Sequence, residues 1–588
     1  MSLLLHIYLL LTSLIQIKKH CLINSVDSCV DEALCGLVRA SGGLALLRGH
    51  RVVLRSDPSN LRGKVALLSG GGSGHEPAHG GYVGAGMLSA AVAGGVFASP
   101  PPASILAAVL ALHDAGASGV LLIVKNYTGD RLNFGLAAEQ ARNHGVAVDM
   151  VIVADDCAFD QPSKAGRRGL CGTVLIHKLA GALAEEGRSL DQIVSKMTEV
   201  LKGIGTLGVS LSPCSVPGCR PSFDLPPGDM ELGLGIHGEP GIKRSKVASA
   251  DEVVKAMLDH MTNPASQSHL PLTTGDTVVL CVNNLGALSC LEMAVVTRAA
   301  INSLENRGVA VARTMSGSFM TSLEMAGVSL TLMKADPETL RLFDTKTGAP
   351  AWPNLSAASV SGRDYVTDPP TSSTPPQDSK HAEGPLSPIM RKALEKICST
   401  LLEKQEELNS LDRAAGDGDC GNTHAQAARA VREWLQGHAV PGRPGEMLSA
   451  LAGLVQEKMG GSSGALYSLF LTAAAGHMTD GRSDAAAWAG AVHAGTQAMS
   501  RYGGMLDALS PAVDELMSLR AAPPADHMAV LQAAVQKAAS GAEATRSLTA
   551  RAGRASYIAA ERVTQPDPGA VAVAAIFRAV LETLQEQE

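Results

Sequence analysis

The chain has 588 residues, of which 46% are hydrophobic and 18% charged, and this composition excludes a mainly disordered protein. That length allows about three to four domains of ordinary size. The formal net charge is −7 and no cluster of Lys and Arg with interleaved aromatic residues occurs, so nucleic acid is not expected as a substrate or partner.

Residues 1–21 are interpreted as an apolar leader with the sequence LLLHIYLLLTSLIQIKK at its centre. Its apolar run of roughly 15 residues is shorter than a membrane span needs. No basic residue precedes the run and no small-residue cleavage site follows it, and the arginines of a mitochondrial transit peptide are missing. We expect a dispensable leader, with membrane association as the minor alternative.

The 11 cysteines are an odd number without a C-x-x-C pair, which is typical of reduced thiols rather than of a disulfide framework or a zinc site. Cys214 and Cys219 lie close together in an expected loop, but no second pair could complete a metal site. The sequence therefore predicts a cytoplasmic protein.

Residues 22–352 are predicted to form an α/β region in two parts. Buried strands are expected at 64–68, 119–124 and 148–153, and amphipathic helices at 101–116 and 133–145. A second set of strands and helices begins near residue 276, so the two parts divide near 200–270. This alternation predicts a parallel sheet with helices on both faces.

Residues 353–387 are predicted to be a linker, because they include a stretch rich in Pro, Ser and Thr without an apolar period. From 388 to 588 the chain is rich in Ala and Leu, and its apolar positions between 390 and 411 follow a helical period. We expect this last domain to be entirely helical.

The stretch SGGGSGHEPAHGG, residues 69–81, has the glycines of a loop whose backbone closely approaches a ligand. A Walker A loop needs Lys and Ser or Thr after its last Gly, and a dinucleotide loop needs G-x-G-x-x-G, so neither motif is present. The stretch predicts a site for a small polar ligand, with His75 in reach, rather than for ATP.

Other polar stretches follow predicted strands, where α/β folds bind ligands. Lys125 and Asp130 follow one strand, and residues 283–289 follow another. On this argument alone, the two charged residues are more often surface charges. His237 lies among glycines in GLGIHGEPG, where it either caps a turn or acts as an imidazole nucleophile near a substrate carbon.

The helical domain contains three carboxylates, Asp412, Asp417 and Asp419, within LDRAAGDGDCGNTH. Clustered carboxylates favour a hard cation such as Mg²⁺, Ca²⁺ or Mn²⁺, and Mg²⁺ is often shared with substrate phosphates. An EF-hand is excluded, because Gly421 and Ala428 replace required ligands.

Downstream, KMGGSSGAL (458–466) predicts either a phosphate-binding helix N-terminus or close helix packing. Together with the carboxylates, it favours ATP binding in the helical domain.

Six stretches occur in order along the chain: GGGSGHEP, KNYTGDRLNFGLA, GLGIHGE, DRAAGDGDCG, GGSSGA and QPDPGA. With them, the chain from residue 22 to its C-terminus resembles the ATP-dependent dihydroxyacetone kinases. The resemblance implies a multidomain protein: an α/β triose-binding region of the DhaK type in two parts, followed by an all-α helical-barrel domain of the DhaL type.

The resemblance also assigns the triose site. It implies that dihydroxyacetone is held by Gly72, Ser73, Gly74, His75, Lys125 and Asp130. His237 matches the histidine that attacks the ketone carbon and forms a covalent hemiaminal. Asp130 would take the proton from the attacking hydroxyl, with His75 assisting.

In the helical domain, Asp412, Asp417 and Asp419 match the carboxylates that hold two Mg²⁺ ions on the ATP phosphates. Nucleotide contacts are implied for Asp417, Gly418, Asp419, Cys420, Ser462, Ser463, Gly503, Met505, Asp567, Pro568 and Gly569.

Animal members of the family also phosphorylate glyceraldehyde and split FAD into AMP and riboflavin cyclic 4′,5′-phosphate, with Mn²⁺ or Co²⁺ favoured over Mg²⁺. The resemblance further implies a homodimer in the cytosol and an innate-immune RNA-sensor helicase as a partner.

The chain departs from the family pattern at one place. The family has a short loop containing P-G-D-R-T before M-L-D, whereas Gly504 here runs directly into Met505. Loss of this loop and its Arg should weaken ATP binding and reduce the rate by several orders of magnitude. Two hypotheses follow: a working kinase, or a catalytically impaired chain that acts as a binding or regulatory protein.

Overall fold

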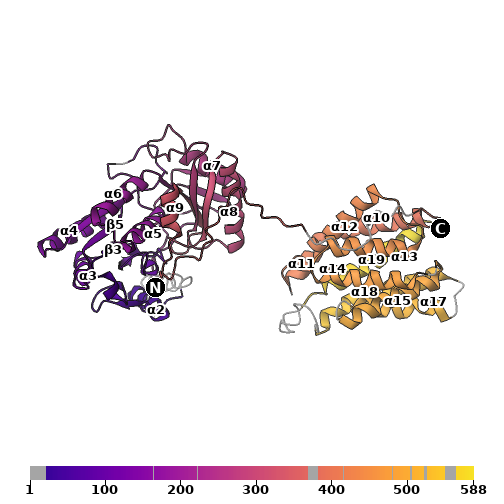
Figure 1. Ribbon diagram of the computed structural model, residues 1–588. Helices are drawn as coiled ribbons and strands as arrows, with labels where there is room; N and C mark the ends of the chain where they lie inside the picture. The colour runs from indigo at the N-terminus through magenta and orange to yellow at the C-terminus, as the bar shows by residue number, and fades with distance from the viewer. Residues whose placement is uncertain are drawn as a thin grey trace. The chain divides into compact units, whose positions relative to one another are not determined.

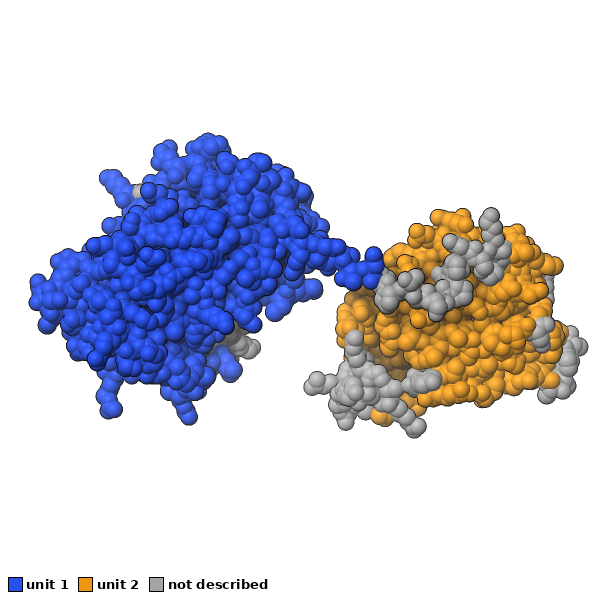
Figure 2. Space-filling model, viewed as in Figure 1, with its two compact units in different colours: residues 1–368 blue, residues 369–588 orange. Residues whose placement is uncertain are grey.

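The computed structural model describes residues 22–162, 164–221, 223–368, 382–414, 416–479, 481–502, 506–521, 526–549 and 564–587 (Figure 1). The chain divides into two compact units, Met1–Asp368 and Pro369–Glu588, called unit 1 and unit 2 below (Figure 2). The leader and most of the Pro-, Ser- and Thr-rich stretch lie outside the described residues.

The first half of unit 1 is a six-stranded sheet in the order β1-β2-β4-β3-β5-β6. Its strands are β1 Leu44–Leu46, β2 Val52–Arg55, β3 Val65–Ser73, β4 Ala90–Val96, β5 Gly119–Lys125 and β6 Val148–Val153. Strands β4, β3, β5 and β6 are parallel, as expected, and β2 joins β1 and β4 antiparallel. The three strands predicted from apolar runs are β3, β5 and β6.

Helices cover both faces of this sheet. They are α2 Cys29–Ala40, α3 Pro102–Asp114, α4 Thr128–Asn143, α5 Gly172–Glu185 and α6 Leu190–Leu201. Leu68 of β3 belongs to the core shared with α3 and α4, whereas its neighbour Leu67 belongs to the core shared with α5 and α6. Alternate residues of a strand therefore face opposite helical layers, which explains the continuous apolar runs.

The second half of unit 1 corrects the expectation of a parallel sheet. Its order is β11-β10-β12-β7-β8-β9, and only β10 and β11 are parallel. The strands are β7 Ile204–Ser210, β8 Asp229–Leu232, β9 Lys243–Lys246, β10 Thr277–Asn284, β11 Ala310–Gly317 and β12 Gly327–Lys334. A parallel pair needs a long crossover, and the short connections after β8 and β11 contain no helix, so the chain reverses direction there.

Three more helices belong to this half: α7 Ala250–Met261, α8 Cys290–Glu305 and α9 Pro337–Asp344. Helices α6, α7 and α8 begin with the same local signal. A Ser side chain before the helix accepts a hydrogen bond from the backbone N–H of the residue three positions later. That residue is Gln or Glu, and its side chain accepts a hydrogen bond from the backbone N–H of the Ser. This capping box fixes each helix start from sequence alone.

Helix α5 joins the two halves. Every residue from its start to Ala184 is buried, and its core includes side chains of both sheets. Just before it, the buried carboxylate of Asp155 accepts hydrogen bonds from Leu170 N (2.6 Å), Gly172 N (2.8 Å) and Thr206 Oγ1 (2.5 Å). These bonds tie the end of the first sheet to β7 of the second and hold the two halves as one unit.

Unit 2 is entirely helical among the residues that the structure describes, as predicted. Its helices are α10 Ser387–Glu403, α11 Gln405–Arg413, α12 Cys420–Gly437, α13 Pro444–Lys458, α14 Gly461–His477, α15 Ala485–Tyr502, α16 Leu506–Leu516, α17 Ser518–Ala521, α18 His527–Ala544 and α19 Pro568–Gln585. Contacts run from α10 through α12, α13, α14, α15, α16, α18 and α19 back to α10, so the helices close into a barrel.

Helix α19 is long and apolar enough to cross a membrane by length and composition. It packs against α10, α16 and α18, and Ala572 and Val573 belong to the cores of unit 2. Its apolar composition is therefore that of a core helix of the barrel.

Candidate functional site

The structure brings His75 and His237 together, which sequence spacing did not do. His75 follows β3 of the first sheet, and His237 lies between β8 and β9 of the second. Their ring centroids are 4.9 Å apart. Lys125 ends β5 and Asp130 lies in the first turn of α4, so these two predicted residues come from the first half of unit 1.

The glycine run is not the loop that its composition suggested, because Gly70 to Ser73 are part of β3. A methyl group on Gly72 would lie 2.7 Å from Cα of Phe97 and N of Ala98. Gly74 has φ +105°, and a methyl group there would lie 2.7 Å from the Phe97 ring. These glycines thus let the segment after β4 pass directly against the strand.

His75 is fully buried and neutral. Its Nδ1 donates to the backbone oxygen of Thr321 (2.8 Å), and Nε2 has no hydrogen-bond partner among the described residues. Burial, reinforced by the charge of Lys125, lowers the pKa of His75 well below its ordinary value. The proton therefore stays on Nδ1, and Nε2 offers a lone pair.

Glu239 is a partner of His237 that the sequence analysis missed. Its Oε1 accepts from Nδ1 of His237 (3.1 Å) and its Oε2 from the His237 backbone N–H (3.1 Å). Burial acts to raise the pKa of Glu239, but the hydrogen bond from His237 and nearby positive charge lower it to about 2. An ionised Glu239 holds the His237 proton on Nδ1, which leaves Nε2 free as a nucleophile.

Lys125 and Asp130 converge on the backbone of Gly71, where an added methyl group would lie 3.3 Å from Lys125 Nζ and 3.6 Å from Asp130 Oδ2. Lys125 is fully buried, its Nζ has no partner among the described residues, and burial lowers its pKa. Asp130 accepts from Ser99 Oγ (2.5 Å). Unpaired buried groups are rare in folded proteins, so this arrangement favours a polar ligand.

Aromatic rings enclose the two histidines, a feature the sequence analysis also missed. Phe97 stacks on His75 (5.1 Å between centroids) and meets His237 edge-on (5.2 Å). Tyr127 meets His237 edge-on from another side (4.7 Å). Phe97 has φ +56°, a strained backbone for a bulky residue, and such strain is concentrated at functional sites. Ser73, another of the residues predicted to bind the triose, donates its hydroxyl to the Gly94 backbone oxygen (2.9 Å).

Three buried histidines predict that unit 1 loses stability in mild acid. Burial, followed by the charge of Lys125, lowers the pKa of His75 and His79 well below the ordinary value and that of His177 to about 3. Below about pH 6.5 the unfolded chain binds protons that the folded chain does not. As the pH drops below this value, the free energy of unfolding of unit 1 should then fall by up to about 1.4 kcal/mol per pH unit for each histidine.

Amide hydrogen exchange in β5, corrected for intrinsic rates, measures this dependence in unit 1 alone. We expect the opening free energy to fall between about pH 7 and pH 5, and His177→Gln to flatten the slope. An opening free energy that is constant over this range would contradict the prediction.

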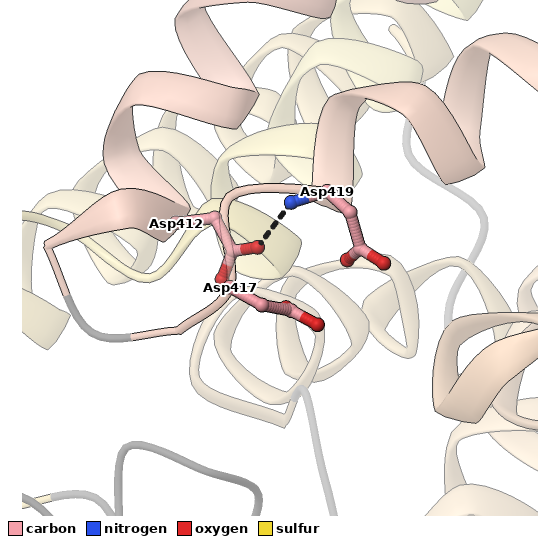
Figure 3. Close-up of side chains that lie close together, drawn as sticks. All are labelled: Asp412, Asp417 and Asp419. Atoms are coloured by element: carbon pink, nitrogen blue, oxygen red, sulfur yellow. Dashed lines mark hydrogen bonds between the residues drawn. The ribbon is translucent and has the colours of Figure 1, made fainter. Parts of the chain in front are cut away.

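The three carboxylates of unit 2 lie where sequence analysis predicted a metal site (Figure 3). Asp412 lies near the end of α11, Asp419 precedes α12, and Asp417 lies between them, with ligand oxygens of all three within 4.8 Å of one another. Asp412 Oδ2 accepts from the backbone N–H groups of Asp419 (2.9 Å) and Cys420 (3.1 Å). An all-oxygen donor set of this kind fits Mg²⁺ or Mn²⁺.

Two further helices contact the helices that flank this cluster: α14 contacts α12, and α19 contacts α11. The Tyr467 hydroxyl of α14 lies 3.2 Å from Nε2 of His424 in α12, so the second turns of these two helices are held together. Burial, together with the carboxylates of Asp412, Asp567 and Asp419, raises the pKa of Cys420 to about 12. The N-terminus of α12 next to hard-cation ligands, with Asp567 at the start of α19 within their electrostatic influence, forms a suitable site for a charged phosphate chain.

Most of the predicted nucleotide residues belong to these helix starts. Ser462 and Ser463 lie in the first turn of α14, and Asp567 caps α19 by accepting from Ala570 N (2.7 Å). Gly503 and Met505 lie outside the described residues.

Comparisons with known proteins show which family the chain belongs to. Two family models match, the Dak1 domain over residues 35–351 and the DAK2 domain over 414–582. The chain is 56% identical over 571 residues to Triokinase/FMN cyclase of Homo sapiens, with 96% of this chain and 99% of that protein covered. The chain belongs to the dihydroxyacetone kinase family.

Relatives within the dihydroxyacetone kinase family extend to bacteria. Dihydroxyacetone kinase of Citrobacter freundii is 39% identical over 598 residues, covering 95% of this chain and 98% of that protein. The crystal structure of the native C. freundii enzyme matches with a TM-score of 0.63 at 35% identity, covering 97% of this chain and all of that one. A structure described as the dihydroxyacetone kinase operon co-activator Dha-DhaQ matches 55% of this chain with a TM-score of 0.51 at 33% identity, covering 97% of that chain.

Proposed function

We propose that this protein is an ATP-dependent kinase of dihydroxyacetone and glyceraldehyde. The observation that carries the proposal is the pairing of His237 Nδ1 with Glu239 (3.1 Å), next to the buried ring of His75 (4.9 Å between centroids). The names of the human and bacterial relatives support the same substrate class.

In this proposal, Nε2 of His237 attacks the carbonyl carbon of the triose, and the π electron pair moves to the carbonyl oxygen. Lys125 supplies a proton to that oxygen, while Glu239 keeps the Nδ1 proton of His237 in place. The product is a covalent hemiaminal. Glycerol has no carbonyl, so this step selects the substrate by reactivity rather than by shape.

Phosphorylation then needs a base for the terminal hydroxyl. Asp130 takes that proton, and the neutral His75 assists through its free Nε2. Asp412, Asp417 and Asp419 would hold Mg²⁺, which neutralises phosphate charge when bound. A solved complex of the C. freundii enzyme with AMP-PNP and Mg²⁺ supports this choice of nucleotide and ion.

We also propose that unit 2 splits FAD into AMP and riboflavin cyclic 4′,5′-phosphate, with Mn²⁺ or Co²⁺ at the same carboxylates. The name of the human relative, which includes FMN cyclase, supports the activity. A cytosolic homodimer and an innate-immune RNA-sensor helicase as partner are finer parts of the proposal and stay predictions.

The rival proposal is a binding or regulatory protein with poor turnover. The direct junction of Gly504 and Met505 favours it, and so does the likeness of unit 1 to a co-activator. The deciding measurement is ATP-dependent phosphorylation of dihydroxyacetone by the purified chain and by a variant with Pro-Gly-Asp-Arg-Thr inserted between these residues.

Comparable activity of both proteins would support the kinase and show that the loop is dispensable. Activity only after insertion would mean that this chain binds its triose but is not a working kinase. Inactivity of both, with folded protein, would overturn the kinase proposal.

A further inference from the structure

One arginine holds the loop of His237 from the other half of unit 1. Residues 233–242 join β8 to β9 of the second sheet, whereas Arg168 lies between β6 and α5 of the first half. Arg168 Nη2 donates to the backbone oxygen of Gly233 (2.7 Å), and Arg168 Nε donates to Asp156 Oδ2 (2.6 Å). Asp156 is buried, so the guanidinium has a fixed anchor on its own side.

The same guanidinium lies close to Glu239, the partner of His237. A methyl group on Gly235 would overlap the Glu239 carboxylate and would lie 2.7 Å from Arg168 Nη1. Burial acts to raise the pKa of Glu239, and the charge of Arg168 is one of the influences that lower it. Arg168 therefore keeps a negative charge next to Nδ1 of His237.

The neighbouring arginine has a different task. Arg167 donates to the backbone oxygens of Asp155 and Asp156 (2.7 Å each) and to that of Ile204 (3.4 Å), so it secures its own loop against β7 rather than the loop of His237. Arg168 instead reaches the loop that bears His237. It pairs with the carboxylate of Asp156 and lies near that of Glu239. Its fork of donors and permanent charge suit it to this task, and lysine reproduces only the charge.

We propose that Arg168 is a positioning residue for the nucleophile. It fixes the Glu239 carboxylate, which holds the His237 ring with its proton on Nδ1 and its lone pair on Nε2, facing the triose. The inference rests on the proposed function, since it takes His237 as the nucleophile. Without Arg168, the two tautomers of His237 should mix and the ring should lose its fixed orientation, so fewer encounters would form the hemiaminal.

The test compares Arg168→Gln and Arg168→Lys with the control Arg244→Gln. Arg244 lies on β9 close to the same loop, but it pairs with Glu231 (2.9 Å) rather than Glu239. We expect Arg168→Gln to lower kcat/KM for dihydroxyacetone roughly ten- to hundredfold, the range seen when partners that orient metal-binding histidines are removed. The KM for ATP should not change, Arg168→Lys should recover part of the loss, and Arg244→Gln should match the parent.

Two spectroscopic measurements separate positioning from a merely structural role. With dihydroxyacetone labelled with ¹³C at its ketone carbon, the parent protein should convert the ketone signal to that of a tetrahedral carbon, and Arg168→Gln should convert much less. Without substrate, ¹⁵N signals of the His237 ring, assigned by their loss in His237→Ala, should show Nδ1 protonated in the parent and a mixture of tautomers in Arg168→Gln. Arg168→Lys keeps the charge beside Asp156, so its ring signals should be intermediate between those of the parent and of Arg168→Gln. This variant replaces Arg168→Gln in the test if the glutamine variant does not fold.

Unchanged ring signals in a folded Arg168→Gln or Arg168→Lys protein would overturn the inference, even if the parent forms the hemiaminal. A parent protein that forms no hemiaminal would overturn the covalent part of the proposed function instead. The tautomer measurement would still decide the role of Arg168 in that case.

Discussion

We expect His237→Ala to lower the rate of dihydroxyacetone phosphorylation by a factor on the order of 10³ or more, as loss of a covalent nucleophile does in other enzymes. The side chain is held on both sides: Glu239 binds Nδ1, and the Phe97 and Tyr127 rings meet it edge-on. Alanine removes the proposed nucleophile. The variant should bind Mg²⁺ and ATP as before, because the contacts proposed for them belong to unit 2.

The matched control is His113→Ala, which removes an exposed imidazole from α3 of the same unit. Its activity should equal that of the parent. Discrimination against glycerol is the second measurement, because it depends on the ketone reaction. Normal turnover and normal discrimination in His237→Ala would mean that Lys125 and Asp130 bind the triose without a covalent bond.

A second large effect is expected from Asp417→Asn, which should reduce Mg²⁺-dependent ATP turnover by about 10²-fold, the typical effect of removing one charge-stabilising group. Asp417 is exposed, whereas Asp412 also accepts two backbone N–H groups at the start of α12. The change at 417 therefore tests metal binding with less effect on the fold. Without metal, the free energy of unfolding of unit 2 should change by less than about 1 kcal/mol.

Titration of the protein with Mg²⁺ and ATP measures the predicted loss directly, and chelation of metal from the parent should mimic it reversibly. The control is Asp514→Asn, an exposed carboxylate on α16 away from the cluster. If Asp417→Asn binds metal and turns over like the control, then the three carboxylates are not the metal site.

Much of the fold follows from local patterns. The apolar runs at β3, β5, β6 and β10 and the amphipathic helices between them were predictable, because a buried strand or half-buried helix leaves its period in the sequence. The parallel arrangement of the second sheet was predicted wrongly. Strand direction depends on which strands become neighbours, and β10 and β12 are neighbours although β11 lies between them in the sequence.

The site was predictable in part. The carboxylates of unit 2 lie within one short segment, so their clustering was visible, and Figure 3 shows them together. Glu239 was missed although it stands two residues after His237, and its role could have been found by asking which group orients a nucleophilic imidazole. Phe97 carried no local signal, because its packing on His75 depends on glycines in a different strand.

The sequence by itself determined the division into an α/β part and a helical part and the acidic cluster, because each rests on residue type and short-range spacing, whereas the roles of His75, Lys125, Asp130 and His237 were implied only by the resemblance to the family. Only the tertiary structure decided that His75 and His237 meet, that Glu239 fixes the tautomer of His237, and that Arg168 reaches its loop. These contacts join residues separated along the chain or depend on side-chain orientation. The physical reason is that burial and packing between the two halves of unit 1, rather than any local pattern, set the distances on which the chemistry depends.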